Sequence, residues 1–268
     1  MASQAIADQR YTVSVGSVFA RSVNIIKSNP LATLGVTFAF MALPSLVLGQ
    51  LGGWASLGQR ADQGLYAAVG AYGLVAGLLW LTASGALVQA AVAHDEGRRA
   101  DLREVLQQGV ARALPLFAVY LLFVLGVWIG CIFLLVPGII LAVMWSVALP
   151  AIVAERPGVF GAFGRSRALT KGARWHVFGI MLLAAVIYML ASAAVGVASV
   201  AGYGSIGALA GGGAIRSVPT LSLPVQLLQS LVTTVMLTWF TMVGAALFLE
   251  LRNWKDGPSV DRLSEIFA

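Results

Sequence analysis

The segment Val136–Gly179, with the sequence VPGIILAVMWSVALPAIVAERPGVFGAFGRSRALTKGARWHVFG, constrains the fold more than any other part of the chain. Gly138 to Glu155 is a run of about eighteen almost uncharged residues, close to the shortest helix that crosses a bilayer core of roughly 30 Å. Pro137-Gly138 predicts a tight turn before this helix, because proline fixes φ and glycine accepts positive φ. Glu155 ends the helix where the headgroups begin, so the segment predicts a membrane-spanning chain.

The residues that follow Glu155 predict a basic surface helix suited to an anionic membrane. Its cations and aromatic anchors are Phe163, Arg165, Arg167, Lys171, Arg174 and Trp175. We expect Arg21, Lys27 and Arg112 to meet the membrane surface in the same way. Glu155 is placed to pair with Arg165 or Lys171, which would fix this surface helix against the preceding span.

The order VPG, apolar run, AER-P and RSRALTKGARW is similar to that of a group of uncharacterised bacterial membrane proteins. The group comprises relatives of the membrane domain of glycerophosphoryl diester phosphodiesterase and YciC-type inner-membrane proteins. The resemblance is clearest from Leu102 to Leu190 and rests on the placement of turns and charges. It implies a helical integral membrane domain without assigned chemistry.

Composition places the whole chain in the membrane. Hydrophobic residues make up 59% and charged residues 10%, against about a quarter charged in an ordinary soluble domain. The single Cys131 lies in an apolar run, so no disulfide framework is expected. The net charge of +6 does not indicate nucleic acid, because the basic residues flank the apolar runs. The N-terminus lacks the pattern of a cleaved signal peptide.

The sequence predicts one all-α, polytopic membrane domain over residues 1–268, with six transmembrane helices and three cytoplasmic interfacial amphipathic helices. The interfacial helices are expected within 1–29, 100–113 and 158–173. The spans are expected in pairs within 30–94, 114–156 and 174–253, followed by a cytoplasmic tail, 254–268.

Two further patterns concern topology. All 17 Lys and Arg except Arg60 and Arg216 fall on the side of the predicted surface helices. The positive-inside bias therefore predicts a bacterial inner-membrane protein with both termini in the cytoplasm. The spacing in Phe19–Lys27 also matches that in Phe163–Lys171, which suggests a threefold repeat of surface helix plus helical hairpin.

Motifs for catalysis or cofactors are weak. Gly202–Gly207 fits G-x-G-x-x-G, but it follows a membrane helix instead of a strand, so we interpret it as a flexible outer loop. His94, Asp95 and Glu96 are consecutive residues at a helix end, which rarely converge on one metal ion. We therefore expect no enzyme activity, no cofactor and no metal site.

The last predicted helix carries a polar face. It consists of Gln226, Ser230, Thr233, Thr234, Thr238 and Thr241. Such a face either lines a passage or amphiphile-binding groove, or joins neighbouring helices through hydroxyl hydrogen bonds. No charged residue lies deep in a span, as ion-coupled transport usually requires.

These observations favour a non-enzymatic scaffold or interaction module. Its expected partners are membrane lipids, anionic ones in particular, and either another membrane protein or further copies of itself. The alternative is a transporter or channel for a small or amphiphilic solute, lined by the threonine-rich face of the last helix.

Overall fold

The computed structural model describes residues 13–50, 63–202 and 223–257. Every regular element in these ranges is a helix, which confirms the all-helical prediction. In chain order they are α2 (Val15–Ser28), the π-helical segments η1 (Leu31–Gly35) and η2 (Phe38–Ala42), α3 (Leu43–Gln50), α5 (Gln63–Asp95), α6 (Leu102–Phe133), α7 (Leu135–Met144), α8 (Ala148–Ala154), α9 (Val159–Thr170), α10 (Arg174–Gly202) and α12 (Leu223–Asp256).

The described helices agree with the predicted number of apolar segments. Five are long and apolar enough to cross a membrane: α5, α6, the α7–α8 pair, α10 and α12. A sixth is obtained if α2 and the helix that follows it count as one span, although the two meet at a bend of 90°. The described part of the chain therefore contains five to six long apolar helices.

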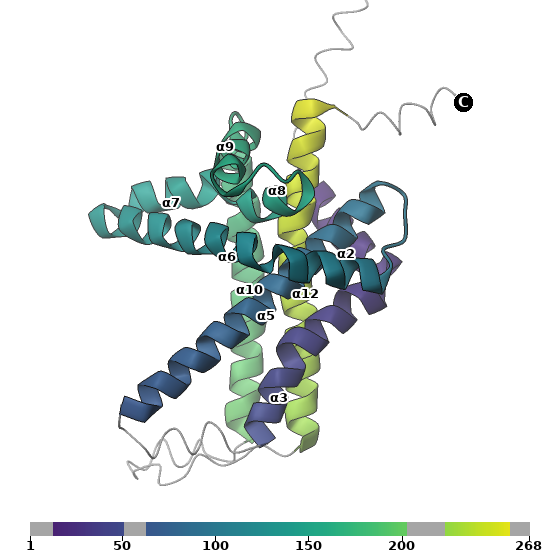
Figure 1. Ribbon diagram of the computed structural model, residues 1–268, viewed down its shortest axis with the longest axis vertical. Helices are drawn as coiled ribbons and strands as arrows, with labels where there is room; N and C mark the ends of the chain where they lie inside the picture. Colours follow the sequence, from purple (N-terminus) through teal and green to yellow (C-terminus); the bar gives the residue numbers. More distant parts are fainter. Residues whose placement is uncertain (1–12, 51–62, 203–222, 258–268) are drawn as a thin grey trace, which may run out of the picture.

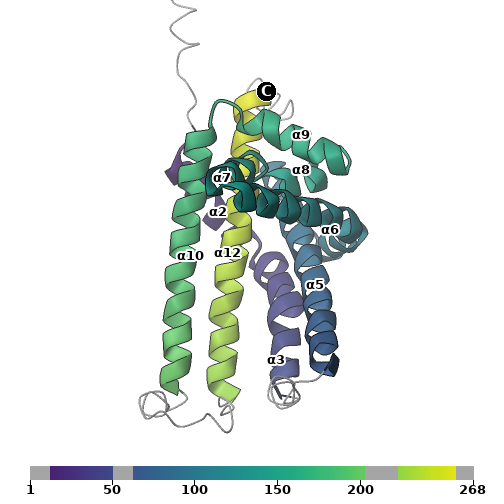
Figure 2. The ribbon, with the colours of Figure 1, turned by 90° about the vertical axis from the view of Figure 1, so that its left-hand side faces the viewer.

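The long helices do not all run in the same direction. In Figure 1, α10 and α12 run side by side along the long axis, and α3 and α5 extend toward the same lower end. The hairpin of α6 and α7 instead lies across this direction. Figure 2 looks along that hairpin, and α6 and α7 are again transverse to α10 and α12.

The core is centred on the C-terminal half of α12. From Met242 to Leu251 nearly every residue of this helix is buried. It is packed against buried residues of α2, α5, α8, α9 and α10, including Ile25, Leu169 and Ile180. The opposite halves of α10 and α12 expose large apolar side chains such as Leu190 and Leu228.

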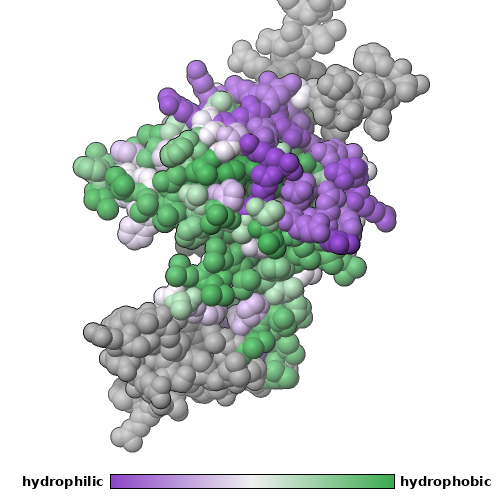
Figure 3. All heavy atoms as spheres, viewed as in Figure 1, coloured by the Kyte–Doolittle hydropathy of each residue, from purple (hydrophilic) through white to green (hydrophobic). Residues whose placement is uncertain are grey.

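Hydrophilic residues gather at the end of the molecule that holds this core. Figure 3 shows them over α9, α2 and the C-terminal end of α12, above a hydrophobic surface. We call this the charged end. Arg60 and Arg216, the two basic residues expected on the other side, lie outside the described residues. Residues 258–268 of the predicted tail also lie outside them.

Two predicted boundaries differ from the structure. The interfacial helix at 100–113 and the span expected from 114 form the single helix α6, which contains Pro115. The turn expected at Pro137-Gly138 occurs instead at Leu134, whose φ of −163° and ψ of 139° separate α6 from α7. Pro137 lies in the first turn of α7, where proline is tolerated because its missing N–H would have no intrahelical partner.

Gly138 is needed for close packing. A Cβ at this position would overlap Sγ of Cys131 on the facing helix. A Cβ added to Gly130 would likewise lie only 2.9 Å from the Cα of Gly138. The predicted fourth span, 138–155, is also interrupted: α7 ends at Met144 and α8 begins at Ala148.

Candidate functional site

The charged end contains a buried group of four ionised residues, which we call the ion cluster: Arg21, Asp95, Glu250 and Arg252. Arg21 of α2 donates to Asp95 at the end of α5 and, over 3.1 Å, to Glu250 of α12. Arg252 donates to Asp95 over 3.0 Å. The side chains of Asp95 and Glu250 are only 5% and 11% exposed. Two cations and two anions thus neutralise each other and join three helices.

A second ion-pair group lies between α9 and its neighbours. Arg165 pairs with Glu155 over 2.6 Å, which is one of the two partners expected for Glu155, and also with Asp256 at the end of α12. The hydrogen bond to Glu155, and to a smaller extent the one to Asp256, raises the pKa of the Arg165 guanidinium above its ordinary value. Glu155 therefore has the structural role assigned to it from the sequence.

The segments Phe19–Lys27 and Phe163–Lys171 have similar surroundings. Each arginine, Arg21 or Arg165, bonds to a carboxylate of α12 and to one at the end of another helix. The serine that follows each arginine is fully buried. Phe19 packs on Trp239 and Phe163 on Trp145, at centroid distances of 5.5 and 4.9 Å.

These contacts correct three of the membrane-surface residues predicted from the sequence. Arg21, Phe163 and Arg165 are turned into the protein, because carboxylates and aromatic rings distant in sequence meet them there. Arg112 is half-buried on α6. Lys27, Arg167, Lys171, Arg174 and Trp175 are exposed as expected.

Five exposed residues form what we call the basic–aromatic face: Phe160, Arg167, Lys171, Arg174 and Trp175. Phe160, Arg167 and Lys171 are seven and four residues apart, which places them on one side of α9 and its end. Phe160 and Trp175 are 81% and 84% exposed. The three cations form no ion pair with any described residue. The sequence predicts Phe160 too as an aromatic anchor of this surface segment.

The polar face of α12 divides into two parts. Ser230, Thr234 and Thr238 are buried, and each hydroxyl bonds to the carbonyl four residues earlier, at 2.7 to 2.8 Å. The Thr238 hydroxyl also lies 2.8 Å from that of Thr37, in the first apolar helix. Gln226 and Thr241 are half-buried. Ser230, Thr234 and Thr238 are therefore closed off inside the protein, and Thr238 joins α12 to another helix.

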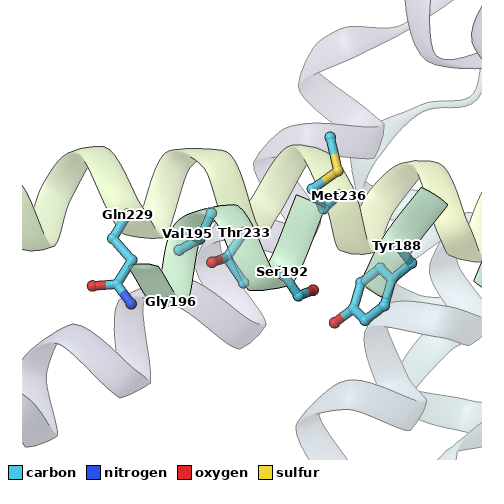
Figure 4. Close-up of a pocket in the computed structure, with 7 residues that line it drawn as sticks. All are labelled: Tyr188, Ser192, Val195, Gly196, Gln229, Thr233 and Met236. Carbon is cyan, nitrogen blue, oxygen red and sulfur yellow. The ribbon is translucent and has the colours of Figure 1, made fainter. Parts of the chain in front are cut away.

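Thr233 instead lies in a half-open groove of about 190 Å³ between α10 and α12. Polar side chains contribute to its lining from both helices: Tyr188 and Ser192 of α10, with Gln229 and Thr233 of α12. In Figure 4, Gln229 and Tyr188 lie at opposite ends of the groove. Val195, Gly196 and Met236 complete the lining.

Within residues 13–50, 63–202 and 223–257, no three His, Cys, Asp or Glu side chains are grouped as a metal site would require. Of the G-x-G-x-x-G motif, only Gly202 belongs to the described residues. No protein-family model, curated protein or solved structure matches the chain.

Proposed function

We propose that this protein is a non-enzymatic membrane scaffold that holds anionic lipid on its basic–aromatic face, at the cytoplasmic surface of a bacterial inner membrane. The supporting observation is that Phe160 and Trp175 are exposed at the two ends of a segment in which the three cations of this face form no ion pair with a described residue. Aromatic rings are favoured at the level of lipid headgroups, where they have one apolar and one hydrated side.

The charge on this face is large enough to select lipids. A basic residue near an anionic surface contributes about 1 kcal/mol. Arg167, Lys171 and Arg174 together would therefore favour an anionic headgroup by about 3 kcal/mol, which is roughly a hundredfold preference. The proposal keeps both termini in the cytoplasm, since the described basic residues flank the helix ends at the charged end.

The test compares lipid selectivity of the protein in detergent or nanodiscs. Spin-labelled phosphatidylglycerol and phosphatidylcholine report the immobilised lipid of each class. We expect the variant R167Q/K171Q/R174Q to lose its preference for phosphatidylglycerol. The matched control, R98Q/R99Q/R103Q, removes the same charge from the α5–α6 connection and the first turn of α6, and should keep most of the preference. Equal loss in both variants would contradict a specific face.

The groove between α10 and α12 supports a second candidate, the binding or passage of a small amphiphile. Its hydroxyl and amide groups offer hydrogen bonds within an otherwise apolar surface. We expect the variant Q229L/T233V to reduce solute uptake into vesicles if this candidate holds. The variant T241V, which alters the same helix outside the groove, serves as its control.

A further inference from the structure

The most unusual surface of the molecule is an apolar arm, which we define as Leu114–Met144 on α6 and α7. No charged residue occurs from Leu114 to Ala154. The arm is exposed along much of its length, and Trp128 and Phe133 are 68% and 79% exposed. A helix that is apolar on all sides requires either protein or lipid around it. In Figure 3 its hydrophobic atoms lie just below the hydrophilic atoms of the charged end.

The transverse direction of the arm is set where α6 crosses α5. A Cβ on Gly109 would lie 2.6 Å from the carbonyl oxygen of Thr82, and a Cβ on Gly85 would lie 2.7 Å from Leu116. Only glycines allow the two helices to approach so closely at this point. The contact fixes α6 across α5, so the arm is directed sideways by packing.

The return segment α7–α8 has the 20 residues of a span, but the break after α7 limits how far the tip lies from the charged end. Helix α7 has 10 residues, which at 1.5 Å each is about 15 Å, half the thickness of a bilayer core. The break after α7 is held at the charged end by α9, because the Ser166 hydroxyl donates to the Met144 carbonyl over 2.9 Å and accepts from the Val147 N–H over 3.3 Å. The distance from this anchor to the tip is too short to reach the opposite surface.

The tip itself also fits the interior of a leaflet better than the opposite headgroups. Ile132–Val136 carries no polar side chain, and each of these residues is more than three-fifths exposed. The Leu134 N–H bonds to the Gly130 carbonyl, and Pro137 has no N–H to satisfy. These two features reduce the number of unpaired backbone donors at the turn, which lowers the cost of placing it in the leaflet.

We propose that the arm lies in the plane of the membrane, within the leaflet on the charged side, and that its partner is the acyl-chain region of that leaflet. The chain then crosses the membrane four times, through η1–α3, α5, α10 and α12. An apolar hairpin inserted into one leaflet acts as a wedge, at a depth of about 5–10 Å below the headgroups. This inference requires a membrane-embedded protein but does not depend on the anionic-lipid contact.

The native cysteine provides the test. Cys131 is the only cysteine and is exposed near the tip. A nitroxide on Cys131, with relaxation agents in the lipid and aqueous phases, reports its depth. We expect a position in the half of the bilayer on the charged side. An impermeant maleimide added from the opposite side should not label Cys131.

Control cysteines calibrate both measurements in a C131S background. V197C on α10 should report the far half, and K171C should be labelled only from the charged side. Because Sγ of Cys131 faces Gly138, L134C in the same background repeats the depth measurement with a label that does not disturb the hairpin. A tip residue found in the far half, or labelled from the far side, would overturn the in-plane arm while leaving lipid selectivity at α9 untouched.

Discussion

Replacing Arg21 by glutamine tests whether the ion cluster holds the charged end together. In the native protein Arg21 bonds to Asp95 and Glu250, which lie on α5 and α12. R21Q keeps a polar side chain of similar size but removes the charge. Glu250, 11% exposed, then loses its cation. Among the four residues of the cluster, Arg252 is then the remaining cation beside two carboxylates.

The expected loss follows from burial. Removing one partner of a buried ion pair costs about 3–5 kcal/mol, because the other charge stays in a medium of low polarity. This corresponds to a decrease of roughly two to three and a half powers of ten in the folded-to-unfolded ratio. The Arg98–Glu96 pair is the natural comparison, since its side chains are 51% and 45% exposed. Breaking such an exposed pair costs about 0–1 kcal/mol.

The measurement is equilibrium unfolding in mixed micelles, followed by circular dichroism and by Trp fluorescence. R21Q should unfold at a clearly lower denaturant fraction than R98Q. The double variant R21Q/E250Q should recover part of the loss, because it removes the unpaired carboxylate as well. Equal midpoints for R21Q and R98Q would show that the cluster carries no special stability. A double variant less stable than R21Q would contradict the pairing itself.

Three smaller perturbations address the helix contacts. T238V removes the hydroxyl contact to Thr37. The free energy of unfolding should fall by about 0.6 kcal/mol, and by roughly 1.7 kcal/mol at most, as for such hydrogen bonds in membranes. G138A forces a Cβ against Sγ of Cys131, so the hairpin should open and Cys131 should react faster with maleimide in detergent. S166A leaves the α7–α8 break without its hydroxyl bridge, and we expect a loss of about 1–3 kcal/mol in the same unfolding assay, with S28A as the exposed-serine control.

Much of the helical arrangement was predictable from hydropathy alone. The spans expected within 30–94 and 174–253 include α5, α10 and α12, whose outer ends lie within a few residues of those bounds. These segments combine length with uniform apolarity, and their ends are marked by charged residues or by proline. Hydropathy reports where a helix is compatible with lipid, so it locates these helices well.

The inward arginines were not predictable by the same reasoning. The amphipathic pattern of the helix expected within 1–29 places Arg21 off its apolar face, which predicts contact with the membrane surface. Its carboxylate partners lie 74 and 229 residues away in the sequence. The available signal was the presence of Asp95 and Glu250 at the ends of apolar runs, where an acidic residue is costly without a partner.

The direction of the arm was also hidden from the sequence. The uncharged run from Leu114 to Ala154 is long enough for two crossings, and its hydropathy is the same whether the hairpin stands upright or lies flat. Local turn chemistry pointed to Pro137-Gly138, but close packing against Cys131 determines the position of Gly138. The transverse direction depends on the contact between Gly85 and Gly109, which are 24 positions apart in the chain.

The topology predicted from charge is the same for an in-plane hairpin and for a hairpin that crosses twice, because the two cases differ by an even number of crossings. A hairpin that leaves the charged side and returns to it places Arg112 and Arg156 on the same side, whether or not it crosses the membrane. Four and six crossings therefore predict the same location for both termini. The two topologies are separated by contacts inside the fold: the Ser166 bonds at the break after α7 and the crossing of α6 over α5 at Gly85 and Gly109. The depth of Cys131 is thus the observation on which the number of crossings depends.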